Sequence, residues 1–279
     1  MAQAQRSLAP EDVELLARLA PAAPTAYHRL NPLTKATAAA GVTLAAIVLG
    51  GYVVPVALLI GVVLPSAAAA GVLRRVARLS LAASAPILVS VVLVSVFTRA
   101  GTTVLFEIGP FDATLEGVDF AARITLRLVV VAMALVLFGL TTDPRSLVAD
   151  LERRGVAPRL TFAIAAALEA VPAMVERTRA VAAAQRARGL DTEGSVGARL
   201  RGIRPLAGPV VLSAFAEVEE RSLALEARGF GRPGHREPLW TPTDSPGQRA
   251  ARWFVVAGVA AALAAVLVAQ AAGVLAGLP

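Results

Sequence analysis

Long uncharged runs alternate with charged segments along this chain of 279 residues. The first uncharged run covers residues 36–73 and is too long for one membrane helix, which needs about 20 residues. Gly50 and Gly51 interrupt this run near its middle. The pattern therefore predicts two short membrane helices, at 36–50 and 53–72, joined by a glycine turn.

Three later apolar runs predict three further membrane helices, at residues 79–98, 123–142 and 254–279. The chain between them changes character, because residues 143–252 hold 17 arginines and 13 acidic residues and cannot lie mostly in lipid. Two apolar stretches lie inside this charged segment, at 160–175 and 206–216. Each suits a tilted interfacial helix, a short membrane entry or a buried packing helix, and we interpret both as the apolar beginnings of amphipathic helices. The predicted fold class is all-α: a polytopic helical membrane protein with about five transmembrane helices and a pair of amphipathic helices.

The basic residues orient these helices, because arginine and lysine gather on the cytoplasmic side of membrane proteins. Basic residues stand before and after the first two predicted helices: Arg29, Lys35, Arg74, Arg75 and Arg78. The loop after residue 98 is instead mainly acidic. We therefore predict a cytoplasmic N-terminus, an external C-terminus and a location in the cell membrane, with Arg249, Arg252 and Trp253 anchoring the inner end of the last helix.

Four parts of the chain follow from this topology. Residues 1–35 form a cytoplasmic N-terminal segment without the apolar core of a signal peptide, in which residues 10–20 favour a short helix. Residues 36–142 hold four transmembrane helices, residues 143–253 form a cytoplasmic segment, and residues 254–279 form the final transmembrane helix.

Composition agrees with a membrane protein, since 56% of the residues are hydrophobic, 17% are charged and the mean hydropathy is +0.67. These values exclude a disordered or collagen-like chain. The absence of cysteine excludes a disulfide scaffold, thiol catalysis and a thiolate metal site. The net charge of +7 is attributed to the cytoplasmic side of the membrane rather than to nucleic acid, because no recognised nucleic-acid module is present.

Arg123 and Arg127 lie four residues apart near the expected outer end of the fourth membrane helix. Their spacing places both on one helix face, where we interpret them as reaching the membrane interface, with Asp119 as an ion-pair partner. A role in a transport pathway is the alternative.

The charged segment contains a short repeat, Ala-x-x-Ala-Arg-Gly. One copy ends in Ala187, Arg188 and Gly189, and the other ends forty residues later in Ala227, Arg228 and Gly229. Each copy closes a helical pattern, and in the second copy the apolar stripe consists of Val211, Phe215, Val218, Ser222 and Leu225.

Capping alone is one explanation of each copy, because a terminal arginine complements the helix dipole and glycine ends the helix. Two matching copies in one segment favour another explanation. Two basic helix tips suit two acidic sockets on partner proteins, since arginine pairs with a carboxylate through two parallel hydrogen bonds.

These motifs resemble those of the T component, the EcfT/CbiQ family, of energy-coupling factor (ECF) transporters. The two Ala-Arg-Gly sequences look like the family's paired X-Arg-X signatures. The segment from His28 to Lys35, His-Arg-Leu-Asn-Pro-Leu-Thr-Lys, is similar to the family's His-x-Leu-Asp-Pro-x-x-Lys. Asn31 replaces the family's aspartate and still permits capping of a helix that starts at Pro32. A cytoplasmic helical segment before a final membrane helix completes the resemblance, from about residue 26 to the C-terminus.

The resemblance implies a coupling role within a larger importer. Ala187, Arg188, Gly189, Ala227, Arg228 and Gly229 would dock on two ABC-type ATPases. The amphipathic helices would pass ATP-driven motion to a substrate-binding S component, for uptake of a vitamin or metal ion. The chain would itself be non-catalytic and would hold neither a cofactor nor a metal, and ATP would bind to the partner ATPases.

The residues agree with a non-enzymatic role. The sequence has no phosphate-binding loop of the Gly-x-x-x-x-Gly-Lys-Ser/Thr type, and His28 and His235 are isolated from other metal ligands. A stand-alone secondary transporter or channel is the alternative function. It predicts ionisable groups inside the membrane helices. A membrane-embedded enzyme is the least favoured class, because the sequence shows no convergent set of titratable groups.

Overall fold

The computed structural model describes residues 25–98, 103–108, 111–189, 196–230, 242–271 and 273. The predicted helix at 10–20 lies outside these residues. The described chain divides into two compact units, one formed by residues 1–143 with 242–279 and the other by Pro144–Thr241. The first contains the membrane bundle, and the second contains the charged helices.

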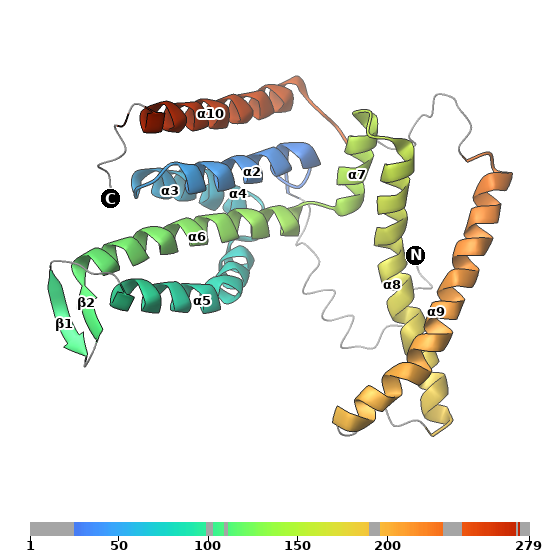
Figure 1. Ribbon diagram of the computed structural model, residues 1–279. Coiled ribbons are helices and arrows are strands. Elements are labelled where there is room, and N and C mark those ends of the chain that lie inside the picture. The colour runs from blue at the N-terminus through green and yellow to red at the C-terminus, as the bar shows by residue number, and fades with distance from the viewer. Residues whose placement is uncertain are drawn as a thin grey trace. The chain divides into compact units, whose positions relative to one another are not determined.

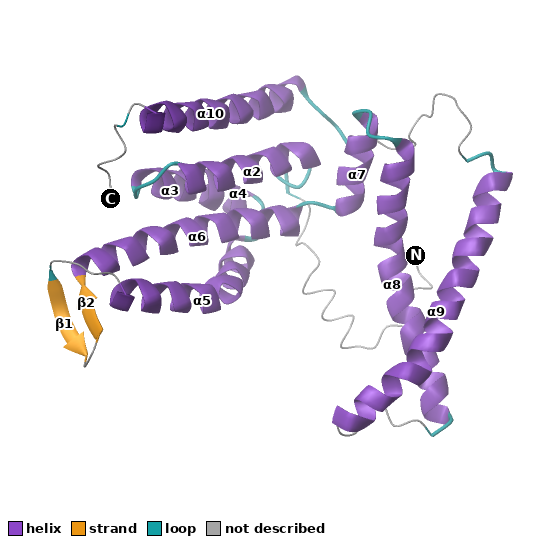
Figure 2. Ribbon diagram, viewed as in Figure 1, coloured by secondary structure: helices purple, strands orange, loops and turns teal. Residues whose placement is uncertain are grey.

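Helices account for most of the membrane bundle (Figures 1 and 2). They are α2 (Pro32–Val48), α3 (Val53–Leu58), a π-helical turn (Leu59–Val63), α4 (Leu64–Ala69), α5 (Leu73–Thr98), α6 (Leu115–Thr141) and α10 (Pro246–Ala271). A short antiparallel hairpin, β1 (Val104–Ile108) and β2 (Phe111–Thr114), joins α5 to α6. The predicted all-α, multi-pass membrane class is confirmed, and the hairpin is an addition that the apolar pattern did not indicate.

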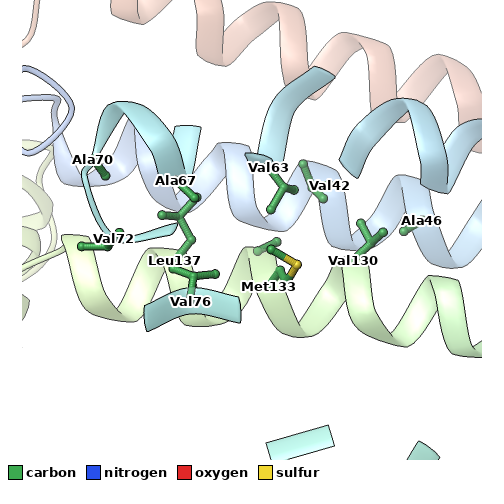
Figure 3. Packing of buried hydrophobic residues seen from close by; sticks show 11 residues of the cluster. Val42, Ala46, Val63, Ala67, Ala70, Val72, Val76, Val130, Met133 and Leu137 are labelled. Carbon is green, nitrogen blue, oxygen red and sulfur yellow. The ribbon is translucent and has the colours of Figure 1, made fainter. Parts of the chain in front are cut away.

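The helices α10, α2, α6 and α5 lie side by side in that order, as Figure 1 shows. The short stretch from α3 to α4 packs against α2 and α6. Small and branched side chains fill the space between these helices, as Figure 3 shows for Val42 of α2, Ala67 of α4 and Leu137 of α6. Close packing by small residues is typical of membrane helix interfaces.

Length and composition make α5, α6, α8 and α10 candidate membrane helices, and α2 and the α3–α4 stretch are shorter apolar helices. α2 and the α3–α4 stretch correspond to the two short helices predicted at 36–50 and 53–72. Helix α8 (Pro158–Ala187) also meets the length and hydropathy of a membrane helix, although sequence analysis assigned it to the charged segment. It contains the apolar stretch 160–175.

Three membrane helices start earlier than their predicted bounds. Predicted starts at residues 79, 123 and 254 become Leu73, Leu115 and Pro246. The predictions began each helix at or shortly after a charged residue, whereas a helix starts where its first amide groups are capped. At α6 the Thr114 hydroxyl accepts a hydrogen bond of 3.2 Å from the Gly117 amide.

Because α6 starts earlier than predicted, its two arginines lie farther from the beginning of the helix. Arg123 forms the predicted ion pair with Asp119, and the Tyr52 hydroxyl donates a 2.7 Å hydrogen bond to the same carboxylate. Arg127, however, lies near the middle of α6 rather than near its outer end. The Arg127 Nε atom is buried and has no hydrogen-bond partner among the described residues.

The second unit consists of α7 (Pro144–Arg153), α8 (Pro158–Ala187) and α9 (Val196–Ala227). Helix α9 begins ten residues before the apolar stretch 206–216, so that stretch lies inside the helix and the prediction that it begins one was wrong. Pro205 and Pro209 both lie within the continuous helix.

Candidate functional site

The two helices that carry the Ala-Arg-Gly repeats form an antiparallel pair. Near one end, the rings of Phe162 on α8 and Phe230 just after α9 have centroids 4.6 Å apart. Near the middle, the Arg177 guanidinium of α8 donates a hydrogen bond to the Glu217 carboxylate of α9. From the first contact to the second, the contacting residue moves forward along α8 and backward along α9, which defines the antiparallel arrangement seen in Figure 1.

The Arg177 ion pair changes the acidity of Glu217. Its hydrogen bond and charge, supported by the charge of Arg221, hold the pKa of the Glu217 carboxyl below its ordinary value. Arg221 Nη2 lies 3.5 Å from the other carboxylate oxygen of Glu217. Glu217 therefore remains ionised in the helix pair, and one carboxylate serves cations from both helices.

The glycine of each repeat ends its helix. Gly189 has a φ angle of 86° and Gly229 one of 73°, a left-handed conformation that glycine adopts without steric cost. After α9, the amides of Gly229 and Phe230 donate 2.9 Å hydrogen bonds to the carbonyls of Glu226 and Leu225, which is the Schellman pattern. Capping thus explains the glycines of the repeat.

The arginines of the repeat need a different explanation. Arg188 and Arg228 are both exposed, and among the described residues no ion pair involves either guanidinium. Helix α7 provides a comparison, because it too ends in Arg-Gly, at Arg154 and Gly155. There the arginine is tied down, since Arg154 Nε lies 3.1 Å from the fully buried Asp150 carboxylate. The two repeat arginines are therefore available to a partner in a way that Arg154 is not.

The two repeat arginines lie at opposite ends of the helix pair. Arg228 is two residues from Phe230, which contacts the first turns of α8, whereas Arg188 caps the far end of α8. At 1.5 Å per residue, the length of α8 from Phe162 to Arg188 is about 39 Å. The flanking residues of the repeat, Ala187 and Ala227, are exposed and too small to cover either guanidinium.

Large apolar side chains of both helices are exposed. On α9 they include Val211, Phe215 and Val218, which belong to the apolar stripe predicted from the sequence and are 49%, 69% and 66% exposed. On α8, Ala170, Val171, Met174, Val175, Thr178 and Arg179 line an open hollow of about 470 Å³. The ion pair between Arg177 and Glu217 joins the two helices and remains partly exposed.

The described residues provide no cluster of side chains that could bind a metal ion. Among them, no group of three or more His, Cys, Asp or Glu side chains lies close enough to hold a metal ion. His235 lies outside the described part of the chain. What the described part of this unit offers chemically is an exposed arginine at the end of each repeat and an apolar surface, which suits binding to other proteins.

Sequence reasoning missed contacts that position these groups. It did not pair Arg177 with Glu217 or Phe162 with Phe230, because residues 40 or more positions apart carry no mutual signal in one sequence. It interpreted Arg252 as an anchor of the last helix but did not identify its ion-pair partner, Asp244. Lys35 did carry a signal, since it is the single lysine among 27 basic residues.

Fold and site together define a multi-pass helical membrane protein that carries a charged helical unit with two exposed arginine tips. The family model for CbiQ, described as cobalt transport protein, matches residues 24–239. The chain therefore belongs to the CbiQ/EcfT family, the transmembrane components of energy-coupling factor transporters.

Individual relatives support this assignment. The energy-coupling factor transporter transmembrane protein EcfT of Thermosediminibacter oceani is 31% identical over 218 residues, which cover 73% of this chain and 79% of that protein. The EcfT protein of Heliobacterium modesticaldum is 34% identical over 62% of this chain and 67% of its own length. The match to EcfT of Exiguobacterium sibiricum, at 35% identity, spans 53% of this chain and 61% of that protein.

Proposed function

We propose that this chain is the coupling subunit of an energy-coupling factor importer. In this role it receives the ATP-driven motion of two ABC-type ATPases at Arg188 and Arg228. It transmits that motion through α8 and α9 to a substrate-binding S component, which takes up a vitamin or a metal ion. The observation that carries the proposal is the pair of equivalent, exposed arginines at opposite ends of one antiparallel helix pair.

The spacing of the arginines suits two separate partners. A distance of about 39 Å along α8 is too large for one small socket and leaves room for one protein domain at each tip. Each tip offers the same local structure, an arginine at the helix end followed by a left-handed glycine. Two ATPases of similar surface could therefore be recognised by the same chemistry, a carboxylate that accepts two hydrogen bonds from the guanidinium.

The exposed apolar side chains of α8 and α9 suit the S component. Phe215 and Leu212 are 69% and 71% exposed on α9, and Val171 is 64% exposed on α8. Aromatic and aliphatic side chains that remain exposed on a charged unit favour contact with another membrane protein or with lipid. A rigid helix that holds an arginine tip at its end and apolar contacts along its length could transmit motion from one partner to the other.

The proposal includes an orientation. The N-terminus and residues 143–253 lie in the cytoplasm, where the ATPases are, and the C-terminus lies outside. The arginines at the start of α5 and in α7, α8 and α9 support this orientation, because arginine gathers on the cytoplasmic side. In the importer ATP would be bound and hydrolysed by the partner subunits, and this chain would contribute no catalytic group or cofactor.

Double charge reversal at the two tips tests the proposal. The variant Arg188→Glu/Arg228→Glu should place a carboxylate opposite each acidic socket, so both ATPases should be lost from the complex while the chain stays in the membrane. Co-purification of the ATPases with the tagged chain measures this, and substrate uptake by cells measures the consequence.

A matched control carries the same change in charge elsewhere. Arg159 in the first turn of α8 and Arg78 on α5 are exposed, and the variant Arg78→Glu/Arg159→Glu should retain both ATPases. Retained ATPases and unchanged uptake in the tip variant would refute docking at Arg188 and Arg228.

One observation favours the alternative function, a stand-alone transporter. Arg127 lies near the middle of α6 with a buried Nε atom that has no partner among the described residues. Ionisable groups within membrane helices often mark a transport pathway. The purified chain, reconstituted alone in liposomes, distinguishes the two functions: solute uptake without ATPases would support the transporter, and its absence would favour the coupling subunit.

A further inference from the structure

The segment from His28 to Lys35 lies where three membrane helices end. α2 begins at Pro32, α6 ends at Thr141 and α10 begins at Pro246, and these ends lie side by side in Figure 1. Asn31 caps α2, as its sequence indicated, because its Oδ1 accepts a 3.0 Å hydrogen bond from the Leu33 amide. The proposed docking of ATPases uses none of these residues, so their contacts need another explanation.

Two residues of the segment connect α2 to α10. The backbone amide of Asn31 donates a 2.9 Å hydrogen bond to Oε1 of Gln248. Arg252 Nη1 donates one of 2.8 Å to the Thr34 hydroxyl. Asn31 is only 1% exposed. Arg252 also donates two hydrogen bonds, of 2.9 and 2.8 Å, to the carboxylate of Asp244. The start of α10 is therefore held to the start of α2 through buried polar contacts.

Lys35 connects α2 to α6. Its ammonium donates a 2.7 Å hydrogen bond to the Thr141 carbonyl at the end of α6 and one of 3.0 Å to the His28 carbonyl. The side chain is 4% exposed, and Nζ lies 5.7 Å from the centroid of the Tyr27 ring. A helix C-terminus carries partial negative charge and stabilises a cation there. The compact ammonium suits this site better than a planar guanidinium, which explains a lone lysine in an arginine-rich chain.

These contacts lie next to both points at which the chain passes between its two units. The unit of α7–α9 begins at Pro144 and ends at Thr241. Thr141, which accepts from Lys35, comes just before the first point, and Asp244, which accepts from Arg252, comes just after the second. Both connections are thus fixed to the same first turn of α2.

We propose that Thr34, Lys35 and Arg252 are positioning residues that form a clamp at the two connections to the coupling unit. The clamp prevents the ends of α2, α6 and α10 from separating when the coupling unit is displaced, so the displacement reaches the membrane helices. This inference rests on the proposed coupling function. Separating these helix ends would leave a buried charge or carbonyl group without a hydrogen-bond partner. The free-energy cost of that loss keeps the clamped ends rigid.

A distance measurement tests the clamp in the full chain alone. The chain has no cysteine, so the exposed residues Arg29 and Arg249 can be replaced by cysteine and spin-labelled in a lipid nanodisc. Double electron–electron resonance between the two spin labels then gives the distance between the start of α2 and the start of α10. Lys35→Met and the milder Thr34→Val should each broaden or lengthen this distance distribution.

Thr37→Val is the matched control for Thr34→Val. Both residues lie on α2, but the Thr37 hydroxyl donates its hydrogen bonds to the carbonyls of Leu33 and Thr34 within its own helix. The control should leave the distance distribution unchanged. An unchanged distribution in both Lys35→Met and Thr34→Val, or an equal change in Thr37→Val, would overturn the clamp.

The coupling role is tested in the complete, reconstituted complex. Thr34→Val and Lys35→Met should retain the ATPases, while substrate taken up per ATP hydrolysed should fall by about tenfold, the shift expected when one hydrogen bond to a charged group is lost. Uptake per ATP that stays at the wild-type value despite a widened distance would overturn the role in coupling. Failure of the proposed function itself is visible separately, because the wild-type chain would then bind no ATPase.

Discussion

The ring of Phe162, in the first turns of α8, packs against the ring of Phe230 with centroids 4.6 Å apart and planes tilted by 51°. Phe230 follows the capping glycine of the second repeat, so this contact attaches the Arg228 tip to the beginning of the other helix. The first repeat has Leu190 at the corresponding position. The two tips thus share a sequence motif, but only the second has phenylalanine at this position.

Replacement of this aromatic ring should loosen one tip and spare the other. Phe230→Ala removes an aromatic pair worth about 0.5–1.5 kcal/mol beyond the area it buries. Amide hydrogen exchange over the last turn of α9 should therefore become faster, while exchange over the last turn of α8 should stay the same. The unaffected α8 end is the internal control, and equal acceleration at both ends would contradict a local role for Phe230.

The two tips should act independently when they are altered singly. Arg188→Glu should remove the contact to one ATPase and Arg228→Glu the contact to the other, because the two arginines lie at opposite ends of the helix pair, about 39 Å apart along α8 from Phe162 to Arg188. Each single variant should retain a weakened complex, and only the double variant should lose both ATPases. Quantitative co-purification measures this, and complete loss of both ATPases in either single variant would contradict independent docking.

The ion pair between α8 and α9 should make the helix pair sensitive to acid. Because Arg177 lowers the pKa of Glu217, the folded protein binds fewer protons here than the unfolded protein between the two pKa values. The stabilisation is fully present above about pH 4.5, the ordinary value for this carboxyl, and is lost as pH falls through the lower folded value.

Glu217→Gln measures this stabilisation. Its thermal midpoint in detergent should lie below that of the wild-type chain at pH 7, and the difference should shrink as the pH falls below 4.5. A difference that stays constant with pH would show that the Glu217 charge does not hold the helices together.

Gly41 allows α2 and α10 to approach closely. A Cβ atom at this position would overlap Cγ1 of Val255 on α10. Gly41→Ala should therefore push α10 away and lower the free energy of unfolding by about 1–3 kcal/mol, the usual cost of overpacking. The thermal midpoint of the purified chain measures this effect.

Gly139→Ala is the matched control on α6, where a Cβ atom would meet no atom within 4 Å outside its own helix. Alanine is favoured over glycine inside a helix by about 0.5–1 kcal/mol, so the control should be neutral or stabilising. A loss of stability equal to that of Gly41→Ala would contradict the packing argument.

The proposed orientation makes a prediction about reporter fusions. A reporter active only outside the cytoplasm should be active when fused after Pro279 and inactive when fused after Pro242. The physical reason is the arginine-rich segment before α10, which favours the cytoplasmic side. The reverse pattern would contradict the orientation.

Much of the membrane bundle was predictable from one sequence. Uncharged runs identified α2, the α3–α4 stretch, α5, α6 and α10, because lipid forces backbone groups into helices wherever side chains are apolar. Helix ends were less predictable. The runs were cut at charged residues such as Arg78 and Arg123, whereas the helices continue past them to a capping residue such as Thr114.

The candidate site was likewise only partly predictable from the sequence. The repeat revealed Arg188 and Arg228 together with their capping glycines, because a helix end and its cap are local in sequence. Nothing local revealed that the two arginines lie at opposite ends of one helix pair. That arrangement depends on Arg177 meeting Glu217 and Phe162 meeting Phe230.

The sequence alone determined that this protein crosses a membrane several times, that a charged helical segment interrupts its apolar helices, and that two helices end in the same arginine–glycine motif. Those properties follow from hydropathy, charge and capping, which act over a few residues. Only the tertiary structure decided which charges are buried and paired with residues that are distant in the sequence. Lys35 and Arg252 flank apolar runs in the sequence, but packing places them beside Thr141 and Thr34, which come from distant parts of the chain.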